Sequence, residues 1–220
     1  MKKEIVKTRD GSNTLFVPEL DETYHSSHGA IQESLHVFIR NGLNFQTVLN
    51  DISVLEVGFG TGLNAFLSFI ESIQTNRKIT YTTLEPYPLE WDVVSKLNYM
   101  DLMFNAKYLD FYQKMHSCPW ESFLEISSNF SIKKQNIKLQ DVVFDNEFDV
   151  IYFDAFAPRV QPDLWTEQIF ASMYKALKSD GILVTYCAKG SVKRALKYVG
   201  FELQSIPGPP GKREMSRAIK

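Results

Sequence analysis

Cysteine is scarce in this chain, and long apolar runs are missing. The two cysteines, Cys118 and Cys187, lie far apart and form no Cys-x-x-Cys unit, so we expect free thiols and neither a disulfide scaffold nor a zinc site. No apolar stretch approaches the ~18 residues of a membrane-spanning helix, and none of signal-peptide length follows the charged N-terminus. These absences predict a cytoplasmic protein that binds neither a membrane nor a metal.

Acidic and basic residues nearly balance, but they are unevenly distributed. The 220 residues include 24 Lys and Arg and 26 Asp and Glu, which gives a formal net charge of -2. Residues 1–180 carry 16 basic and 24 acidic side chains, whereas residues 181–220 carry 8 basic and 2 acidic ones. The basic C-terminal segment leaves two interpretations open, a solvated surface or a contact for a phosphate backbone.

The first fifty residues differ in pattern from the rest. Short β-prone stretches flank Asp10-Gly11, a hairpin-type turn, and Pro18 ends the second of them. Residues 27–41 place apolar side chains at helical spacing and are followed by Gly42. We therefore expect residues 1–50 to form a hairpin and helix appendage packed on a core domain of residues 51–220, with one structural domain overall.

From residue 52 onward, buried strands alternate with amphipathic helices. This alternation predicts an α/β fold with a doubly wound, mostly parallel, seven-stranded sheet. An inserted β-hairpin is expected within 123–140, and a turn at 179–181. The last two strands, 201–206 and 214–219, must pair antiparallel because only a short Pro-Gly-rich loop joins them. The other predicted elements are strands at 52–57, 79–84, 148–153 and 182–186, and helices at 63–73, up to about 97, within 99–117, at 165–177 and at 192–199.

A glycine-rich loop lies at the first strand-to-helix junction, where sheets of this kind bind ligands. It reads Glu56-Val57-Gly58-Phe59-Gly60-Thr61-Gly62. The third glycine of the dinucleotide fingerprint is replaced by Leu63, and no Lys-Ser/Thr pair of a phosphate loop follows, which disfavours NAD, FAD and ATP. Glu56 ahead of the glycines suits a cationic amino group and indicates S-adenosylmethionine. The alternative is a turn needed only for packing.

Three further acids end predicted strands. Glu85 is placed to accept the hydroxyl hydrogens of a ribose. Asp141 is placed to accept a hydrogen bond from an adenine amino group, with a helix N-cap as the alternative. Asp154 opens the stretch Asp154-Ala155-Phe156-Ala157-Pro158 and could orient an amine and take its proton. The alternative is a loop-capping Asp154 with Phe156 in the core.

The combined motifs resemble the methyltransferase domain of the MnmC family of tRNA-modifying enzymes, and more closely its stand-alone MnmD-type forms. The D-A-F-A-P and G-K-R-E-M stretches are more specific than the glycine loop. The matching stretches are residues 24–41, 56–64 (EVGFGTGLN), 85–89 (EPYPL), 154–165 (DAFAPRVQPDLW) and 211–215 (GKREM).

This resemblance implies a Rossmann-like class I S-adenosylmethionine-dependent methyltransferase fold and methyl transfer to a tRNA. The acceptor would be the primary amine of 5-aminomethyl-(2-thio)uridine at the wobble position of the anticodon region, with Asp154 as catalytic acid/base. Expected cofactor-binding residues are Glu56, Gly58, Phe59, Gly60, Thr61, Gly62, Asn64, Glu85, Pro86, Asp141 and Asp154. Expected substrate-binding residues are Tyr24, Phe156, Pro158, Lys212 and Arg213.

One feature of the family is not expected in this chain. Its bifunctional members carry an FAD-dependent oxidase that creates the free amine, and 220 residues leave no room for it. We therefore expect the methylation step alone, with a homodimer or a partner enzyme that supplies the aminomethyl intermediate. Two other functions stay open, a small-molecule amine N-methyltransferase and a non-catalytic methyltransferase-fold partner protein.

Overall fold

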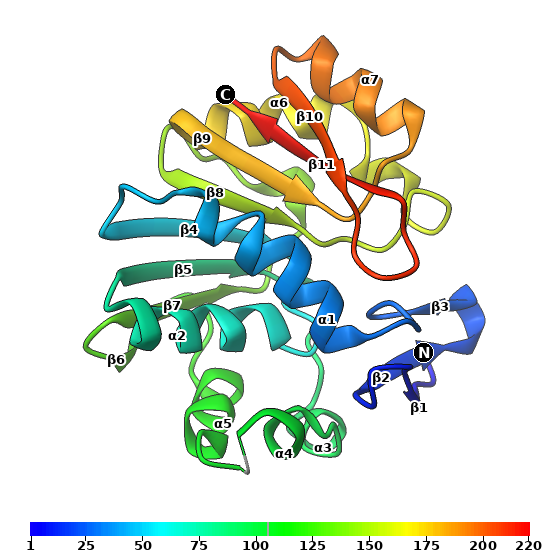
Figure 1. Ribbon diagram of the computed structural model, residues 1–220, viewed down its shortest axis with the longest axis vertical. Coiled ribbons are helices and arrows are strands. Elements are labelled where there is room, and N and C mark those ends of the chain that lie inside the picture. Colours follow the sequence, from blue (N-terminus) through cyan, green and yellow to red (C-terminus); the bar gives the residue numbers. More distant parts are fainter. Residues whose placement is uncertain (105) are drawn as a thin grey trace.

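The computed structural model, which describes residues 1–104 and 106–220, is built around a twisted mixed sheet (Figure 1). The sheet has eight strands in the order β10-β11-β9-β8-β4-β5-β7-β6. The five strands from β9 to β7 in this order are mutually parallel. The strands are β4 (Asp51–Val57), β5 (Lys78–Leu84), β6 (Phe123–Ser127), β7 (Phe130–Gln135), β8 (Phe148–Phe153), β9 (Leu177–Thr185), β10 (Glu202–Pro207) and β11 (Glu214–Ile219).

The predicted α/β class and the antiparallel C-terminal pair are confirmed. β10 pairs antiparallel with β11, and β11 pairs antiparallel with β9. The sheet has eight strands instead of the predicted seven, because the hairpin strand β6 also joins the sheet edge beside β7. The predicted turn at 179–181 is wrong, since these residues belong to β9, whose register with β8 shifts between Phe148 and Val150.

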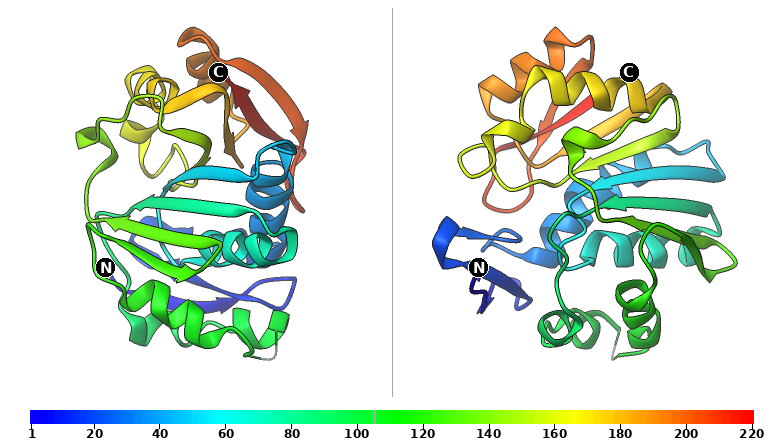
Figure 2. Two further views of the ribbon diagram at one scale, coloured as in Figure 1. Left: turned by 90° about the vertical axis from the view of Figure 1, so that its left-hand side faces the viewer. Right: turned by 180° about the vertical axis from the view of Figure 1, so that it is seen from behind.

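Alternating side chains of the strands fill two separate cores, one on each face of the sheet. Val54 and Val150 belong to a core shared with α2 (Leu63–Thr75), whereas Leu55 and Ile151 belong to one shared with α6 (Glu167–Ala176) and α7 (Gly190–Tyr198). Figure 1 shows α2 in front of the sheet, and the view from behind in Figure 2 shows α6 on the opposite face. Both faces are therefore covered, as parallel strands require.

The short helices that follow β5 lie against the α2 side of the molecule. They are α3 (Trp91–Val94), α4 (Tyr99–Phe104) and α5 (Leu109–Ser117). Phe111 of α5 stacks on Phe69 of α2 with 5.0 Å between ring centroids. Figure 1 shows these helices at the bottom of the molecule, beneath α2. None of the helices in the described part of the chain combines the length and apolar character that a membrane crossing requires.

The N-terminal residues form a separate three-stranded antiparallel sheet, made of β1 (Glu4–Lys7), β2 (Asn13–Val17) and β3 (Glu22–Thr23). A helix follows, with α-helical residues Ala30–Ser34 (α1) continued by π-helical residues Leu35–Arg40. Figure 1 shows the small sheet beyond the carboxyl ends of the parallel strands, with α1 leading back across the main sheet. Leu15 and Ala30 share the buried core of α2. The domain division at residue 50 stays a prediction.

Four short 3-10 segments complete the elements. They are Pro18–Leu20, Leu43–Phe45, Leu139–Asp141 and Pro162–Leu164. The first and last of these begin at a proline, whose fixed φ and missing N–H suit a first helical turn. Both contribute residues to the wall of a cavity at the carboxyl ends of the strands.

Candidate functional site

A cavity of about 740 Å³ opens at the carboxyl ends of β4, β5 and β8. Its wall combines the glycine loop after β4, Glu85 after β5 and Asp154 after β8 with Tyr24 from the N-terminal segment and Lys212 from the β10–β11 loop. Residues from both ends of the chain thus enclose the strand ends that the sequence singles out.

The glycine loop passes close to the end of β8. Gly58 has a φ of +93°, and a Cβ at this position would lie 3.1 Å from the backbone oxygen of Asp154. The N–H of Gly58 donates to the oxygen of Leu84, and the N–H of Asp154 donates to the oxygen of Val57. A side chain at residue 58 would therefore force β4 and β8 apart at the cavity floor.

Helix α5 supports the glycine loop from below. The hydroxyl of Tyr112 donates to the backbone oxygen of Thr61 over 2.5 Å, and Nε2 of His116 lies 3.1 Å from the same oxygen. Burial and the nearby Lys134 lower the pKa of His116 to about 3. The ring is therefore neutral near pH 7, and its Nε2–H donates to Thr61. This role of His116 was not predicted from the sequence, because 55 positions separate it from Thr61.

Glu85 lies on the cavity wall with both carboxylate oxygens anchored. Oε2 accepts the N–H of Gly60 over 3.0 Å, and Oε1 accepts the N–H of Tyr87 over 2.8 Å. Burial raises the pKa of Glu85, while these two hydrogen bonds oppose the rise. Each oxygen keeps a second acceptor direction for a hydroxyl group.

Asp154 is the cavity carboxyl whose protonation changes near neutral pH. Its pKa is raised to about 7, chiefly by burial and then by the charge of Glu33, while Asn64 and Lys212 oppose the rise. The amide nitrogen of Asn64 donates to Asp154 Oδ2 over 2.8 Å. A carboxyl group with this pKa can both accept and release a proton at physiological pH.

Lys212 points into the cavity. Its Nζ lies 2.7 Å from Oε2 of Glu33 in α1 and 3.8 Å from the ring centroid of Tyr186, just after β9. Arg213 is exposed and does not line the cavity. Glu33 and Tyr186 were not predicted as site residues. In the local sequence pattern, Glu33 looks like any acidic residue of a helix, and Tyr186 looks like any aromatic residue of the core.

Two aromatic side chains close the cavity on the N-terminal side. Tyr24 and Phe156 meet edge to face with 5.1 Å between ring centroids. Tyr24 also covers the glycine loop, because a Cβ on Gly60 would lie 3.2 Å from its ring. The indole N–H of Trp165 donates to the backbone oxygen of Phe156 over 2.9 Å and fixes the loop after β8.

The structure brings most of the predicted residues to one wall, but not all of them. Those outside the wall are Glu56, Gly62, Asp141, Pro158 and Arg213. Those on it are Tyr24, Gly58, Phe59, Gly60, Thr61, Asn64, Glu85, Pro86, Asp154, Phe156 and Lys212.

The predicted strand-end position of Asp141 is wrong, and Glu56 does not line the cavity, so its contact with the cofactor stays a prediction. Glu56 is completely buried and does not line the cavity, and its Oε2 accepts the hydroxyl of Thr83 over 2.7 Å. Burial raises its pKa well above the usual value. Asp141 does not end a strand: β7 stops at Gln135, and Asp141 is an exposed residue of the following 3-10 segment.

Within residues 1–104 and 106–220, no three His, Cys, Asp or Glu side chains are grouped so as to hold a metal ion. Cys118 and Cys187 are both free thiols and buried.

Comparisons with known proteins agree with this geometry. A family model described as S-adenosyl-L-methionine-dependent methyltransferase matches residues 105–220. The bifunctional protein MnmC of tRNA 5-methylaminomethyl-2-thiouridine biosynthesis from Leptospira borgpetersenii is 29% identical over 209 residues, covering 89% of this chain and 32% of that protein. The corresponding protein of Cupriavidus metallidurans is 26% identical and matches 98% of this chain and 33% of its own length.

A solved structure extends the similarity to the whole fold. The crystal structure of MNMC2 from Aquifex aeolicus superimposes with a TM-score of 0.79 at 25% identity, over 99% of this chain and 69% of that one. The chain spans about a third of the length of the curated relatives it matches. The MnmC-like resemblance and the cofactor S-adenosyl-L-methionine are thereby confirmed, and the chain belongs to the S-adenosyl-L-methionine-dependent methyltransferase family.

Proposed function

We propose that this protein methylates the primary amine of 5-aminomethyl-(2-thio)uridine at the wobble position of tRNA. The observation that carries the proposal is Asp154, a cavity carboxyl with a pKa of about 7 beside the glycine loop. The matched relatives are named for tRNA 5-methylaminomethyl-2-thiouridine biosynthesis and as bifunctional proteins. We propose that this chain carries the methyl-transfer step and that another activity supplies the amine.

The cavity wall fits the cofactor. Gly58 and Gly60 of the glycine loop line the cavity, so the loop backbone itself forms part of the wall that a cofactor would contact. Glu85, anchored at the end of β5, has acceptor directions for the two ribose hydroxyls. When bound, S-adenosyl-L-methionine would supply an electrophilic methyl group on a sulfonium. We assign Gly58, Gly60 and Glu85 to holding it.

Asp154 has a defined task in this reaction. A primary amine is mostly protonated at neutral pH and cannot act as a nucleophile until it loses a proton. The Asp154 carboxylate would accept that proton, leaving the nitrogen with its lone pair. The pKa of about 7 suits the exchange, since the group is ionised in part of the molecules and returns the proton to water readily.

The basic C-terminal segment is the proposed contact for the tRNA backbone. Residues 181–220 carry 8 basic and 2 acidic side chains, and Arg213 points outward from the β10–β11 loop. Such contacts with phosphates would make tRNA binding fall as salt rises. They would also bring the wobble nucleoside to the adjacent cavity mouth, where Lys212 lies.

Methyl transfer to a defined tRNA tests the proposal. The protein is incubated with S-adenosyl-L-methionine labelled in the methyl group and tRNA carrying 5-aminomethyl-2-thiouridine, and digested nucleosides are separated. We expect label in the wobble nucleoside alone, and a loss of about 10²-fold or more in Asp154→Asn, the scale of general acid–base catalysis. The exposed Asp101→Asn serves as the matched control. Label in another nucleoside, or none despite cofactor binding, would contradict the proposal.

A further inference from the structure

The Lys212 ammonium lies in a small subsite of charged and aromatic groups inside the cavity, which we call the ammonium seat. The seat is formed by Glu33 and Tyr186, at 2.7 Å and 3.8 Å from Nζ. The Glu33 side chain is only 8% exposed, whereas that of Lys212 is 32% exposed and reaches the cavity mouth. The hydroxyl of Tyr186 donates to the backbone oxygen of Ala155 over 2.8 Å, which fixes the ring beside Asp154.

A buried carboxylate and the face of an aromatic ring that both contact the same nitrogen form a binding arrangement for a primary ammonium ion. Lys212 provides such an ion from the chain itself. The proposed acceptor provides the same chemical group, and Asp154, the proposed proton acceptor, lines the same cavity as Glu33 and Tyr186. The cation that fills the seat in this structure therefore has the chemistry of the substrate.

We propose that Glu33 and Tyr186 form the binding subsite for the primary ammonium of the acceptor, and that Lys212 occupies it until the acceptor takes its place. This inference rests on the proposed function for the identity of the acceptor. Exchange of one ammonium for another keeps the buried Glu33 charge paired throughout, so displacement of Lys212 leaves no isolated buried anion. Lys212 then moves outward beside Arg213, where a phosphate can receive it.

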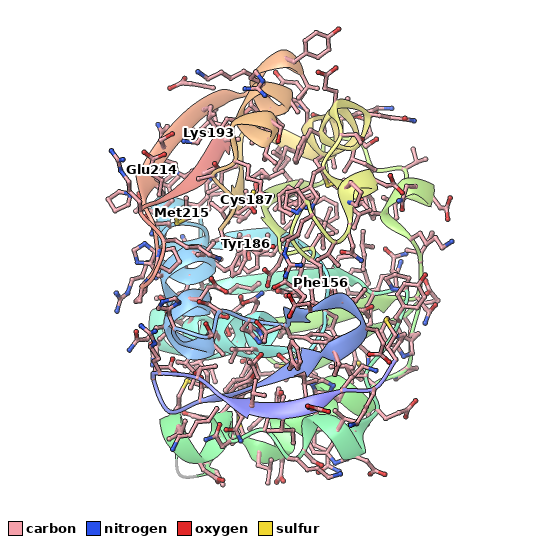
Figure 3. All side chains as sticks on the ribbon, turned by 90° about the vertical axis from the view of Figure 1, so that its right-hand side faces the viewer. Phe156, Tyr186, Cys187, Lys193, Glu214 and Met215 are labelled. Atoms are coloured by element: carbon pink, nitrogen blue, oxygen red, sulfur yellow. The ribbon has the colours of Figure 1, made fainter. Side chains whose placement is uncertain are left out.

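The exchange also discriminates among ligands. An ammonium can replace Lys212, but a neutral group of similar size would leave Glu33 without a cation. A second Lys–Glu pair offers a matched comparison: Lys193 Nζ lies 2.6 Å from Glu214 Oε2, outside the cavity. Figure 3 shows Lys193 and Glu214 toward the outer edge of the molecule and Tyr186 and Phe156 toward its middle.

Binding of free nucleosides tests the subsite without turnover. Calorimetry with S-adenosylhomocysteine present measures the affinity for 5-aminomethyluridine and for 5-hydroxymethyluridine, which lacks the charge. Lys212→Met empties the seat, so 5-aminomethyluridine should bind about tenfold tighter, a factor equal to about 1.4 kcal/mol. The affinity for 5-hydroxymethyluridine should not change. Lys193→Met should leave both affinities unchanged.

A second substitution locates the effect at the carboxylate. Glu33→Gln should weaken binding of 5-aminomethyluridine, and adding Lys212→Met to it should give no gain, because the gain requires the Glu33 charge. The proposal is overturned if Lys212→Met fails to tighten binding, or if it tightens binding of 5-hydroxymethyluridine equally. Retained affinity for S-adenosylhomocysteine establishes that each variant is folded.

A measurement on the protein without substitutions tests the exchange even if the variants do not fold. Nζ of Lys212 lies 3.8 Å from the Tyr186 ring centroid. The NMR signal of the adjoining ε-methylene group should therefore be shifted upfield in a lysine-labelled protein. Adding 5-aminomethyluridine should return that signal to the position of a solvent-exposed lysine, whereas 5-hydroxymethyluridine should not. An unmoved signal at saturating nucleoside would contradict the exchange.

The subsite and the proposed function can fail separately. If the protein methylates the wobble nucleoside but Lys212→Met binds 5-aminomethyluridine no better, the subsite is wrong and the function stands. If Lys212→Met binds the nucleoside better but no tRNA is methylated, Glu33 and Tyr186 still form a subsite for an ammonium ligand. The proposed acceptor is then wrong.

Discussion

The Asn64 amide donates a 2.8 Å hydrogen bond to Asp154 Oδ2, joining the first turn of α2 to the end of β8. The two residues are 90 positions apart in the chain, but both belong to strand-to-helix connections at the same edge of the sheet. A donor at this point favours the ionised form of Asp154 and opposes the effect of burial on its pKa.

Removing this donor should change the pH dependence of methyl transfer. In Asn64→Ala the pKa of Asp154 should rise further, because a hydrogen bond to the charged form is lost. The proposed mechanism uses the ionised carboxylate, so the acid limb of the rate profile should move up by about one pH unit. The profile of kcat against pH checks this, with the exposed Asn50→Ala as control. If the acid limb of Asn64→Ala lies at the same pH as that of the original protein, the Asn64 hydrogen bond does not lower the pKa of Asp154.

The buried Glu56 gives a second prediction. Among the described residues, its Oε1 and the Oδ1 of Asn64 are buried without hydrogen-bond partners. Burial raises the pKa of Glu56, which favours the protonated form, and that form carries a hydrogen-bond donor. Glu56→Gln keeps a neutral donor at the same place, so cofactor affinity and methyl transfer should stay within about threefold of the original protein.

Calorimetry with S-adenosyl-L-methionine and a rate measurement check this expectation. Glu56→Leu, which has no donor, should reduce the rate more than Glu56→Gln does. A large loss of cofactor affinity in Glu56→Gln would instead mean that an ionised Glu56 contacts the ligand.

Asp154 should also make stability depend on pH. The unfolded chain releases this proton near the ordinary value of 3.8, whereas the folded protein holds it until about pH 7. Between these values the folded state binds more protons, so the free energy of unfolding should fall as pH rises. Asp154→Asn removes this pH-dependent contribution to the free energy of unfolding.

Urea unfolding at pH 4.5 and at pH 7.5 measures the effect. The original protein should lose more stability between the two values than Asp154→Asn does, while the exposed Asp101→Asn should behave like the original. Equal pH dependence in the original protein and Asp154→Asn would show that Asp154 titrates alike in the folded and unfolded states.

Gly58 and Gly11 form a matched pair for testing the cavity floor. Their φ angles are +93° and +88°, but a Cβ would lie 3.1 Å from Asp154 oxygen at residue 58 and would meet nothing within 4 Å at residue 11. Both alanine variants should lose about 1–3 kcal/mol to backbone strain. Only Gly58→Ala should also lose cofactor affinity, as calorimetry would detect. Equal affinity in both variants would mean that the close approach to Asp154 does not matter for binding.

Periodicity was enough to predict the main strands and helices, because both faces of the sheet are buried and the apolar patterns are strong. The rule that ligands bind at carboxyl ends of strands placed Glu85 and Asp154 on the cavity wall. It misplaced Asp141, since β7 ends at Gln135 and not directly before Asp141. It did not predict that Glu56 lies outside the cavity wall, because an apolar pattern does not reveal which way a side chain near the end of a strand points.

The remaining site residues depend on long-range packing. Glu33 meets Lys212 across 179 positions, and His116 reaches Thr61 from α5. Neither Glu33 nor His116 lies at a strand end or in a recognisable spacing. Their positions follow from how α1, α5 and the β10–β11 loop pack around the cavity, which local sequence patterns do not encode.

The order of strands constrains how the protein is assembled during synthesis. β11 follows β10 in the chain but lies between β10 and β9. β10 therefore leaves the ribosome before the strand that attaches it to the sheet. The glycine loop, Glu85 and Asp154 can come together earlier, around the completed parallel strands. The loop that carries Lys212 takes its place only when β11 inserts, so the cofactor wall can form in a nascent chain before Lys212 can occupy the site between Glu33 and Tyr186.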